Sequence, residues 1–403
     1  MQRQKILFLA HRFPYPPNRG DRIRSYNLLR VLADHFDISL GCTSDEPITE
    51  EQISHVKQFC SQVFVYELGK WNRRIRGGTA LLGSKSLTEA MFHSPQLHQQ
   101  IHSWQQADKF DQIVVFCSSM YPYVDNEAFG NTPTIVDLVD VDSEKWSQLA
   151  TERSFPMSWI YGREARAVRK LESKIGDSSK LVTLVSESEA QLYRDLIKPS
   201  CPVSGISNGV DTEYFQPGPS SAKAPTNNTV HLVFTGVLDY TPNVEGMIWF
   251  CKEVMPRLRD HGDFQLKVVG RRPTASIQEL SQIDGVEIVG EVPDVRPYLH
   301  AADIAISPLK LARGIQNKVL EAMACGLPTV ISPQSAEGID AIPGREFWIA
   351  EDDEQWIKVL ADLSNDQNQS FNTGKLARDL VVNHYSWSAK LVAFIDEINH
   401  ASK

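Results

Sequence analysis

One short segment in the second half of the chain carries two ionisable side chains that are spaced to act together. Lys318 and Glu321 lie three residues apart in a stretch of helical pattern, so both fall on one helix face near its start. Free backbone N–H groups at a helix start favour anions, and a lysine adds a point charge for phosphate. A carboxylate one turn further along can accept hydrogen bonds from sugar hydroxyls. The pair would suit a nucleotide diphosphate with its ribose.

The residues around this pair indicate a loop, a helix and then a strand. Gly326 and Pro328 end the predicted helix, and the apolar run 329–331 follows it. The alternative is a helix on which Lys318 and Glu321 merely pair in solvent. Such a helix has no need of Gly314 or of the polar residues 316–317 before it, so we favour the ligand-binding interpretation.

Two further candidates follow predicted strands of the second half. Gly236 follows the strand 231–235, and a glycine there lets the backbone approach a ligand closely, although a plain turn explains it equally well. Arg271 and Arg272 follow the strand 265–269. The carboxyl edge of a parallel sheet is where ligands bind in such folds, and a solvated pair of arginines is the alternative.

A rigid loop follows the first predicted strand, because it is rich in proline and contains a glycine. It includes Asn18, Gly20 and Asp21, and Arg24 lies one turn into the next helix. We expect Gly20 and its neighbours to face a ligand at the end of this strand, and Arg24 to point the same way. Asp21 could instead simply cap the helix.

Acidic residues alternate at strand spacing after the predicted strand 134–138. If that strand continues, Asp140 and Asp142 lie on one side of it. We favour one of them as a polar contact or a base at a bound ligand, and a helix-capping aspartate with solvated neighbours is the alternative. A metal site would need more converging oxygen ligands, so we expect neither a metal nor another cofactor.

Short apolar strands alternate with longer amphipathic stretches along both halves of the chain, which is the α/β pattern of parallel sheets. Two such series predict two Rossmann-like sheets. The predicted strands are 6–10, 38–43, 63–66, 113–117, 134–138, 181–185 and 203–206, then 231–235, 265–269, 286–289, 304–307, 328–331 and 347–350. A polar Pro/Ser-rich linker at 216–229 separates an N-terminal domain (1–215) from a C-terminal domain (230–384).

Bulk composition excludes several classes of protein. The net charge of −9 argues against general nucleic-acid binding, and six scattered cysteines without a Cys-x-x-Cys spacing argue against zinc and disulfides. A reducing cytoplasm fits best, and no signal peptide or membrane helix is expected. The basic and aromatic segment 70–92 could contact anionic lipid peripherally, or it could equally be a solvated loop.

Several separated motifs together resemble the GT-B glycosyltransferases of family 4, and more narrowly the sugar transferases associated with PEP-CTERM/exopolysaccharide gene systems. The resemblance covers nearly the whole chain. It implies two Rossmann-like domains that face an interdomain cleft, with the C-terminal helix 385–403 completing the first domain. The motifs lie at 12–21, 186–188, 208–211 and 312–328.

The resemblance also assigns roles at the donor site. Glu321 matches the family's ribose-binding glutamate, the loop around Val292 would lie against the nucleobase, and Asp140 and Asp142 lie roughly where the family keeps a histidine near the donor sugar. The diphosphate would be held by Lys318 and the backbone of Gly314, Ile315, Gln316 and Asn317.

Arg313 is a departure from the family's pattern, since it stands where the family usually has a glutamate eight positions before the ribose glutamate. An arginine could bind the diphosphate or a carboxylated sugar, or it could form a salt bridge to the other domain. The stereochemical outcome of the reaction therefore stays open.

These patterns predict an enzyme that transfers a sugar from a nucleotide-sugar donor to a glycan or polyprenyl-linked acceptor during polysaccharide or glycoconjugate assembly. It would act in the cytoplasm or at the inner face of the cytoplasmic membrane. Two alternatives are a nucleotide-sugar epimerase of the same fold and an inactive donor-binding protein. A dinucleotide dehydrogenase is not favoured, because no G-x-G-x-x-G follows a strand.

Overall fold

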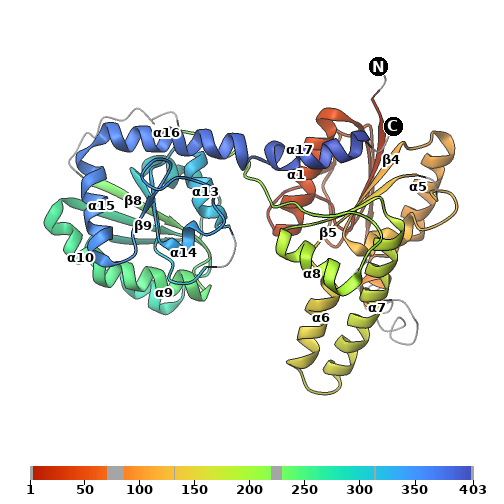
Figure 1. Cartoon of the computed structure of the whole chain (residues 1–403), viewed down its shortest axis with the longest axis horizontal. Coiled ribbons are helices and arrows are strands. Elements are labelled where there is room, and N and C mark those ends of the chain that lie inside the picture. Colours follow the sequence, from red (N-terminus) through yellow and green to blue (C-terminus); the bar gives the residue numbers. More distant parts are fainter. Residues whose placement is uncertain (1–2, 70–85, 131, 219–228, 313–314, 401–403) are drawn as a thin grey trace. The chain divides into compact units, whose positions relative to one another are not determined.

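The structure is a computed structural model that describes residues 3–69, 86–130, 132–218, 229–312 and 315–400. It forms two compact units (Figure 1). Unit 1 comprises Met1–Asn208 and Lys390–Lys403, and unit 2 comprises Gly209–Ala389. The chain thus passes between units at 208/209, before the proposed linker at 216–229, and returns to unit 1 within its last helix.

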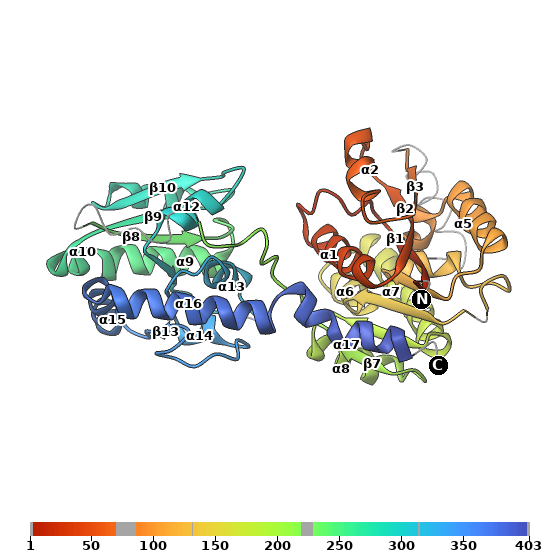
Figure 2. The ribbon, with the colours of Figure 1, turned by 90° about the horizontal axis from the view of Figure 1, so that it is seen from above.

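Unit 1 contains a seven-stranded parallel sheet in the order β3-β2-β1-β4-β5-β6-β7. All of the strands predicted in the first half are present. They are β1 (Lys5–Ala10), β2 (Asp37–Ser44), β3 (Gln62–Glu67), β4 (Gln112–Phe116), β5 (Thr134–Val139), β6 (Leu181–Leu184) and β7 (Val203–Gly205). The strands are nearly continuous apolar runs because helices cover both faces of the sheet (Figure 2).

Several helices of unit 1 begin at side-chain caps. Ser86 forms a capping box at α4, and Ser94 caps α5 directly before Pro95. The helices are α1 (Gly20–His35), α2 (Glu50–Val56), α4 (Leu87–Phe92), α5 (Pro95–Ala107), η1 (Ser118–Tyr123), α6 (Asp142–Thr151), α7 (Met157–Ser178), α8 (Glu187–Ile197) and α17 (Trp387–His400).

The last part of α17 packs into unit 1. Phe394 and Ile398 are fully buried, and the side-chain amide of Gln112 donates to the carbonyl oxygen of Ile398 at 2.5 Å. The last helix is therefore held against unit 1, as its amphipathic pattern allows.

Unit 2 contains a six-stranded parallel sheet in the order β10-β9-β8-β11-β12-β13. The strands predicted in the second half are also all present. They are β8 (Thr229–Thr235), β9 (Asp263–Val269), β10 (Val286–Gly290), β11 (Ile304–Ser307), β12 (Thr329–Ile331) and β13 (Trp348–Ile349). The core packs around Phe234, Phe250 and Trp356, and the last two rings meet edge to face at 5.3 Å.

The helices of unit 2 include α13, which carries the ionisable pair found in the sequence. They are α9 (Thr241–Trp249), η2 (Phe250–Val254), α10 (Met255–Leu258), η3 (Arg259–His261), α11 (Ala275–Gln278), η4 (Glu279–Gln282), α12 (Arg296–Ala301), α13 (Asn317–Ala324), α14 (Pro333–Ala336), α15 (Asp353–Asn365) and α16 (Gln367–His384).

Each sheet has one point at which the strand order reverses. In unit 1 this point lies between β1 and β4, and in unit 2 it lies between β8 and β11. In open α/β sheets, loops leave in opposite directions at such a point, and ligands bind there, at the carboxyl ends of the strands. Lys318 and Glu321 come after β11, and Gly20 and Asp21 come after β1. Both groups of candidate residues therefore follow strands at these points.

Candidate functional site

Helix α13 begins close to the reversal point of the unit 2 sheet. Its apolar side chains, among them Val319 and Met323, are buried, so the opposite face carries Lys318 and Glu321. The side chain of Gln316 at its N-cap does not cap the helix. Gly326 ends it with a φ of +75°, and the N–H of Leu327 returns to the carbonyl oxygen of Ala322 at 3.1 Å. The sequence prediction of this helix is confirmed.

Lys318 is held in one position by neighbouring elements. Its amino group donates to the side-chain oxygen of Asn243 on α9 and lies 4.7 Å from the centre of the Phe234 ring. Asn243 is itself buried and donates to the carbonyl oxygen of Val237 at 2.8 Å. Desolvation lowers the pKa of Lys318 to about 8, and the nearby Glu321 carboxylate opposes this shift. The ammonium group of Lys318 therefore lies beside the end of β8 and the start of α9.

Glu321 lies one turn further along α13. Desolvation raises the pKa of its carboxyl group to about 7, against the opposing effect of Lys318. Within the described residues no hydrogen bond or ion pair is recorded for this carboxylate, so its acceptor capacity remains available for a ligand. Two neighbouring groups that titrate near neutrality are typical of functional sites.

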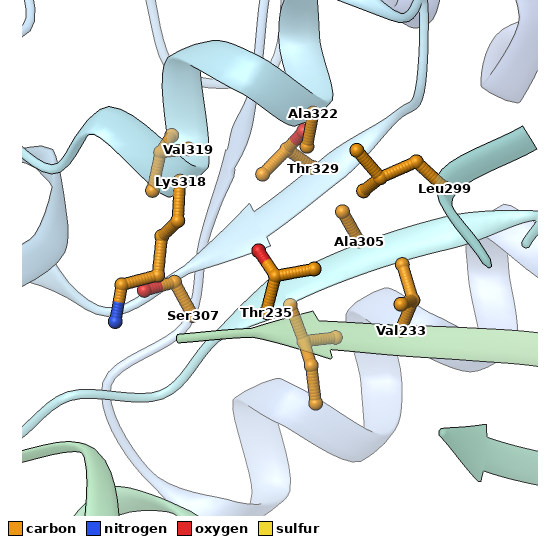
Figure 3. Close-up of a pocket in the computed structure, with 10 residues that line it drawn as sticks. Val233, Thr235, Leu299, Ala305, Ser307, Lys318, Val319, Ala322 and Thr329 are labelled. Atoms are coloured by element: carbon orange, nitrogen blue, oxygen red, sulfur yellow. The ribbon is translucent and has the colours of Figure 1, made fainter. Parts of the chain in front are cut away.

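A small cavity lies beside Lys318, between α13 and the sheet (Figure 3). It is lined by the stem of Lys318, by hydroxyl groups such as that of Thr235, and by apolar side chains such as Leu299. Its volume is about 10 Å³, which is room for about one water molecule. A nucleotide would therefore bind outside this cavity. The amino group of Lys318 points away from Leu299 and lies on the side of Ser307 (Figure 3).

Gly236 lies where two backbones approach closely at the ends of β8 and β9. A Cβ atom at Gly270 would meet the carbonyl oxygen of Gly236 at 1.6 Å, so Gly270 cannot carry a side chain without a backbone shift. At Gly236 the nearest atom to an added Cβ would be the Asn243 side-chain nitrogen, at 3.0 Å. Gly236 is thus next to the residue that holds Lys318.

The other expected donor residues of unit 2 differ in how they are placed. Arg272 has a φ of +58° and pairs with Asp239 at 3.0 Å, whereas the side chain of Arg271 is exposed and forms no hydrogen bond or ion pair among the described residues. Val292 is half-buried and packs against the cluster under α12.

The loop before α13 is described only in part. Arg313 and Gly314 lie outside the described residues, so their expected roles stay predictions. Ile315 packs in the unit 2 core, Gln316 forms the N-cap, and Asn317 is exposed at the first position of the helix. Buried Ser332 supports the strand ends nearby, since its hydroxyl group donates to the carbonyl oxygen of Leu309 at 2.6 Å.

In unit 1, Asn18 and Gly20 are exposed, and Asp21 joins a charged cluster after β1. The carboxylate of Asp21 accepts from Arg12 and from Arg19, each at 2.9 Å. Desolvation would raise the pKa of Asp21, but the contacts with His11 and the two arginines outweigh it and lower the pKa. The alternative of a helix-capping Asp21 is wrong, because the N-cap of α1 is Arg19 and Asp21 lies inside the first turn.

His11 was not singled out in the sequence, yet it lies beside this cluster at the end of β1. The imidazole is buried, stacks on Phe116 at 5.8 Å and has its Nε2 atom 2.7 Å from the Arg12 guanidinium. The same Nε2 atom lies 3.4 Å from the Asp21 carboxylate, so it faces both a guanidinium donor and a carboxylate acceptor. Nδ1 has no hydrogen-bond partner within the described residues. Only its contact with Asp21 could have identified His11 as part of this cluster, and a single sequence does not show that contact.

The expectation that Arg24 points toward a ligand together with Gly20 is wrong. Arg24 does not face an open loop, because its side chain is 2% exposed and forms an ion pair with the equally buried Asp137 at 2.7 Å. Its guanidinium also donates to the carbonyl oxygen of Ile206 at 2.8 Å and to the side chain of Asn208 at 2.9 Å. Thr183 donates to the same carboxylate at 3.0 Å. Arg24 therefore stabilises unit 1 from within and is not available to a ligand.

The expected alternation of Asp140 and Asp142 along one strand is also wrong. Strand β5 ends at Val139, whose φ is +71°, and Asp142 is the first residue of α6. Lys145 pairs with Asp140 and lies 3.9 Å from Asp142. Desolvation, with help from Asp140, raises the pKa of Asp142 to about 6, although Lys145 opposes the shift. The two carboxylates remain neighbours, but through a turn.

Backbone strain and a second raised carboxyl group occur close to this turn. Val139 and Cys117, at the ends of β5 and β4, both have a positive φ, which is rare for residues with a side chain and is concentrated at functional sites. Glu172 on α7 is buried and accepts from the backbone N–H of Ser143 at 3.1 Å, and desolvation raises its pKa to about 7. The carboxyl edge of this sheet is therefore a second candidate site.

Across the described ranges, no three His, Cys, Asp or Glu side chains converge in a way that could hold a metal ion. None of the described helices is both long and apolar enough to span a bilayer. Of the segment 70–92, residues 70–85 lie outside the description. Phe92 is buried against Arg12 and His11, which excludes it from a lipid contact.

The chain is similar in sequence to known proteins. Residues 229–366, which lie in unit 2, match the family model described as glycosyl transferases group 1. A protein described as an uncharacterized 44.6 kDa protein in the cps region of Klebsiella pneumoniae is 20% identical over 374 residues, which cover 89% of this chain and 91% of that protein.

Solved structures share its fold. A sucrose-phosphate synthase from Thermosynechococcus elongatus is matched with a TM-score of 0.61 and 16% identity over 99% of both chains. Anabaena HepE in complex with UDP-glucose is matched with a TM-score of 0.58 and 13% identity over 98% of this chain and 99% of that one. WaaG, a glycosyltransferase involved in lipopolysaccharide biosynthesis, is matched with a TM-score of 0.55 and 16% identity over 96% and 98%. The chain therefore has the GT-B fold, with two Rossmann-like α/β domains.

Proposed function

We propose that this protein is a glycosyltransferase that moves a sugar from a nucleotide-sugar donor to a glycan or polyprenyl-linked acceptor. The observation that carries the proposal is the desolvated pair of Lys318 and Glu321 at the start of α13, inside the segment that matches group 1 glycosyl transferases. One group supplies a fixed cation and the other an unused carboxylate, which are the two contacts that a nucleotide diphosphate and its ribose require.

In this proposal unit 2 binds the donor. Glu321 accepts hydrogen bonds from the ribose hydroxyls, while Lys318 and the backbone at 314–317 hold the diphosphate. Arg271, exposed at the end of β9, is better placed than Arg272 to add positive charge, because Arg272 is already paired with Asp239. The loop at Val292 contacts the nucleobase. HepE structures containing UDP and UDP-glucose support a nucleotide-sugar ligand for this fold.

Unit 1 binds the acceptor in this proposal. Asp142, with a pKa raised to about 6, is the preferred polar contact or base for an acceptor hydroxyl, and Asp140 restrains Lys145 beside it. The departing nucleotide diphosphate is stabilised by Lys318 and by the N–H groups at the start of α13. This chemistry uses the charges of the chain alone, so we propose that it requires neither a metal nor another cofactor.

Within this class, the motifs favour the family 4-like transferases associated with PEP-CTERM/exopolysaccharide systems. WaaG, which has the same fold, is described as acting in lipopolysaccharide biosynthesis, and this supports a place in glycoconjugate assembly. We propose a cytoplasmic location, at the inner face of the membrane when the acceptor is lipid-linked.

The proposal is tested by incubating the purified protein with nucleotide sugars and candidate acceptors. We expect release of a nucleoside diphosphate that depends on the acceptor, together with a product that carries the sugar. A sugar altered without transfer would identify an epimerase, and donor binding without turnover on any acceptor would identify an inactive donor-binding protein. Either result would refute transferase activity.

A further inference from the structure

One exposed surface of unit 1 is separate from the strand edges described above. It lies on α7 and on the turn that joins α6 to α7, two helices packed side by side (Figure 1). Three large apolar side chains are exposed there: Phe155 is 81% exposed, Trp159 is 54% exposed and Met157 is 39% exposed. An exposed group of large apolar side chains is typical of a surface that contacts a membrane or another protein.

The solvent-facing side of α7 continues from these residues as a stripe of cations. Arg166 and Lys170 follow Trp159 by seven and eleven residues, which places all three on one face of the helix. The opposite face is buried in unit 1 through residues such as Val168 and Ile175. Over about 16 Å of helix, at 1.5 Å per residue, an aromatic anchor is therefore followed by positive charge on the same side.

The charge on α7, all of whose residues are described, is asymmetric between its two faces. The helix carries five cations and three acids, but two of the acids, Glu164 and Glu172, are buried. Within the described part of the chain, no ion pair or hydrogen bond is recorded for Arg166 or Lys170. Because the whole chain has a net charge of −9, this positive stripe is a local feature rather than part of a basic protein.

We propose that this face of α7 docks on an anionic membrane surface. Trp159 and Phe155 would lie at the level of the lipid headgroups, where amphipathic aromatic side chains are favoured, and Arg166 and Lys170 would contact the phosphates. A helix with an apolar end, a basic side and a buried back lies along a membrane and does not cross it. The inference rests on the proposed location at the inner face of the membrane and deepens it by naming the surface that makes the contact. The docking itself does not depend on turnover.

The experiment measures binding of the full-length protein to vesicles of phosphatidylcholine alone and of phosphatidylglycerol with phosphatidylcholine in about a 3:7 ratio. We expect binding to the anionic vesicles, weaker binding at high salt, and little binding to the neutral ones. Each cation near an anionic surface contributes about fivefold to affinity, so Arg166→Gln with Lys170→Gln should weaken binding about 25-fold. Trp159→Gln should weaken it several-fold and leave a charge-dependent remainder.

Matched controls separate this face from general charge and hydrophobicity. Lys57→Gln with Lys109→Gln removes two exposed cations elsewhere on unit 1, and Phe371→Gln removes a 61% exposed aromatic from unit 2. Both controls should bind like the wild type. Circular dichroism and melting temperature verify that every variant is folded.

Three outcomes would overturn the proposal. One is a wild type that does not bind anionic vesicles at low salt. Another is a pair of control variants that lose as much binding as the α7 variants. The third is self-association of the wild type that Trp159→Gln abolishes without any vesicle binding, which would assign the face to a second copy of the chain instead.

Discussion

Lys318 and Glu321 illustrate how two ordinary residues acquire unusual chemistry through burial. Desolvation disfavours the charged form of each, and each partly restores the charge of the other. A bound diphosphate would favour the ammonium form of Lys318. Ribose hydroxyl groups would favour the carboxylate form of Glu321. Ligand binding would therefore complete a site whose charges are only partly compensated within the unit.

The first prediction concerns the pH dependence of nucleotide affinity. Glu321, with a pKa of about 7, must lose its proton to accept two hydrogen bonds, so affinity should rise as the pH increases from 6 to 7.5. Lys318, with a pKa of about 8, must keep its proton, so affinity should fall above pH 8. Calorimetric titration across this range should give a bell-shaped curve.

Single variants show which residue is responsible for the acid limb and which for the alkaline limb of that curve. Glu321→Gln should remove the acid limb, and Lys318→Met should remove the alkaline limb while weakening binding overall. A flat profile for the wild type, or acid limbs that are identical in the wild type and Glu321→Gln, would show that the pair does not contact the nucleotide.

The second prediction tests whether Arg24 is structural. Arg24→Ala leaves the Asp137 carboxylate buried without its partner, which should cost about 3–5 kcal/mol of unfolding free energy. The double variant Arg24→Met with Asp137→Leu removes both charges and should recover most of this loss. Urea denaturation measures the stability, and kcat/KM should recover with it. A stable double variant that has lost donor or acceptor binding would instead return Arg24 to the functional site.

At the scale of the elements, backbone geometry shapes the region of unit 2 that we propose as the donor site. Helix α13 is terminated by Gly326, and the ends of β8 and β9 meet through Gly236 and Gly270. These glycines are needed for different reasons. The first adopts a left-handed conformation with room around it, whereas Gly270 is excluded from carrying a side chain by a neighbouring carbonyl group.

The third prediction ranks three glycine substitutions by melting temperature. Gly326→Ala should cost about 1 kcal/mol, because only the left-handed φ opposes it. Gly270→Ala should cost clearly more, since the added Cβ would lie 1.6 Å from the Gly236 oxygen. Gly20→Ala should be neutral, with nothing within 4 Å of the new atom. An unstable Gly20→Ala protein would contradict this ranking, and a stable but inactive one would indicate a ligand at Gly20.

The elements were predictable because buried parallel strands are short continuous apolar runs, which a single sequence shows directly. The end of β5 was not, because Val139 adopts a left-handed φ that no valine predicts, and this broke the alternation assumed for Asp140 and Asp142. Contacts between distant residues were also invisible. The bond from Lys318 to Asn243 spans 75 residues, and that from Arg24 to Asp137 spans 113.

At the scale of the whole molecule, each unit has a Rossmann-like sheet with one reversal of strand order, and the functional candidates gather at these two points. We propose the same division of labour for activity, with unit 2 binding the donor and unit 1 the acceptor. Charge on the chain itself then stabilises the leaving group.

The fourth prediction follows from that division. Sugar transfer should persist in EDTA at an unchanged rate, because Lys318 and the start of α13 supply the positive charge that a metal ion would otherwise provide. The measurement is the initial rate with and without chelator, followed by addition of Mg²⁺ or Mn²⁺. Complete loss of transfer that a metal restores would show that Asp140 and Asp142 have a metal-binding role.

The most direct test of the account is nucleotide-sugar binding to the wild type and to Glu321→Ala. A ligand that binds only the folded state raises the melting temperature, so a panel of nucleotide sugars can be screened by thermal shift and the best one titrated. We predict that at least one stabilises the wild type saturably. Glu321→Ala should weaken it by about tenfold to hundredfold, or about 1.5–3 kcal/mol for a lost charge-assisted hydrogen bond. Equal affinity in a folded Glu321→Ala protein, or no binding by the wild type, would contradict the proposed donor site.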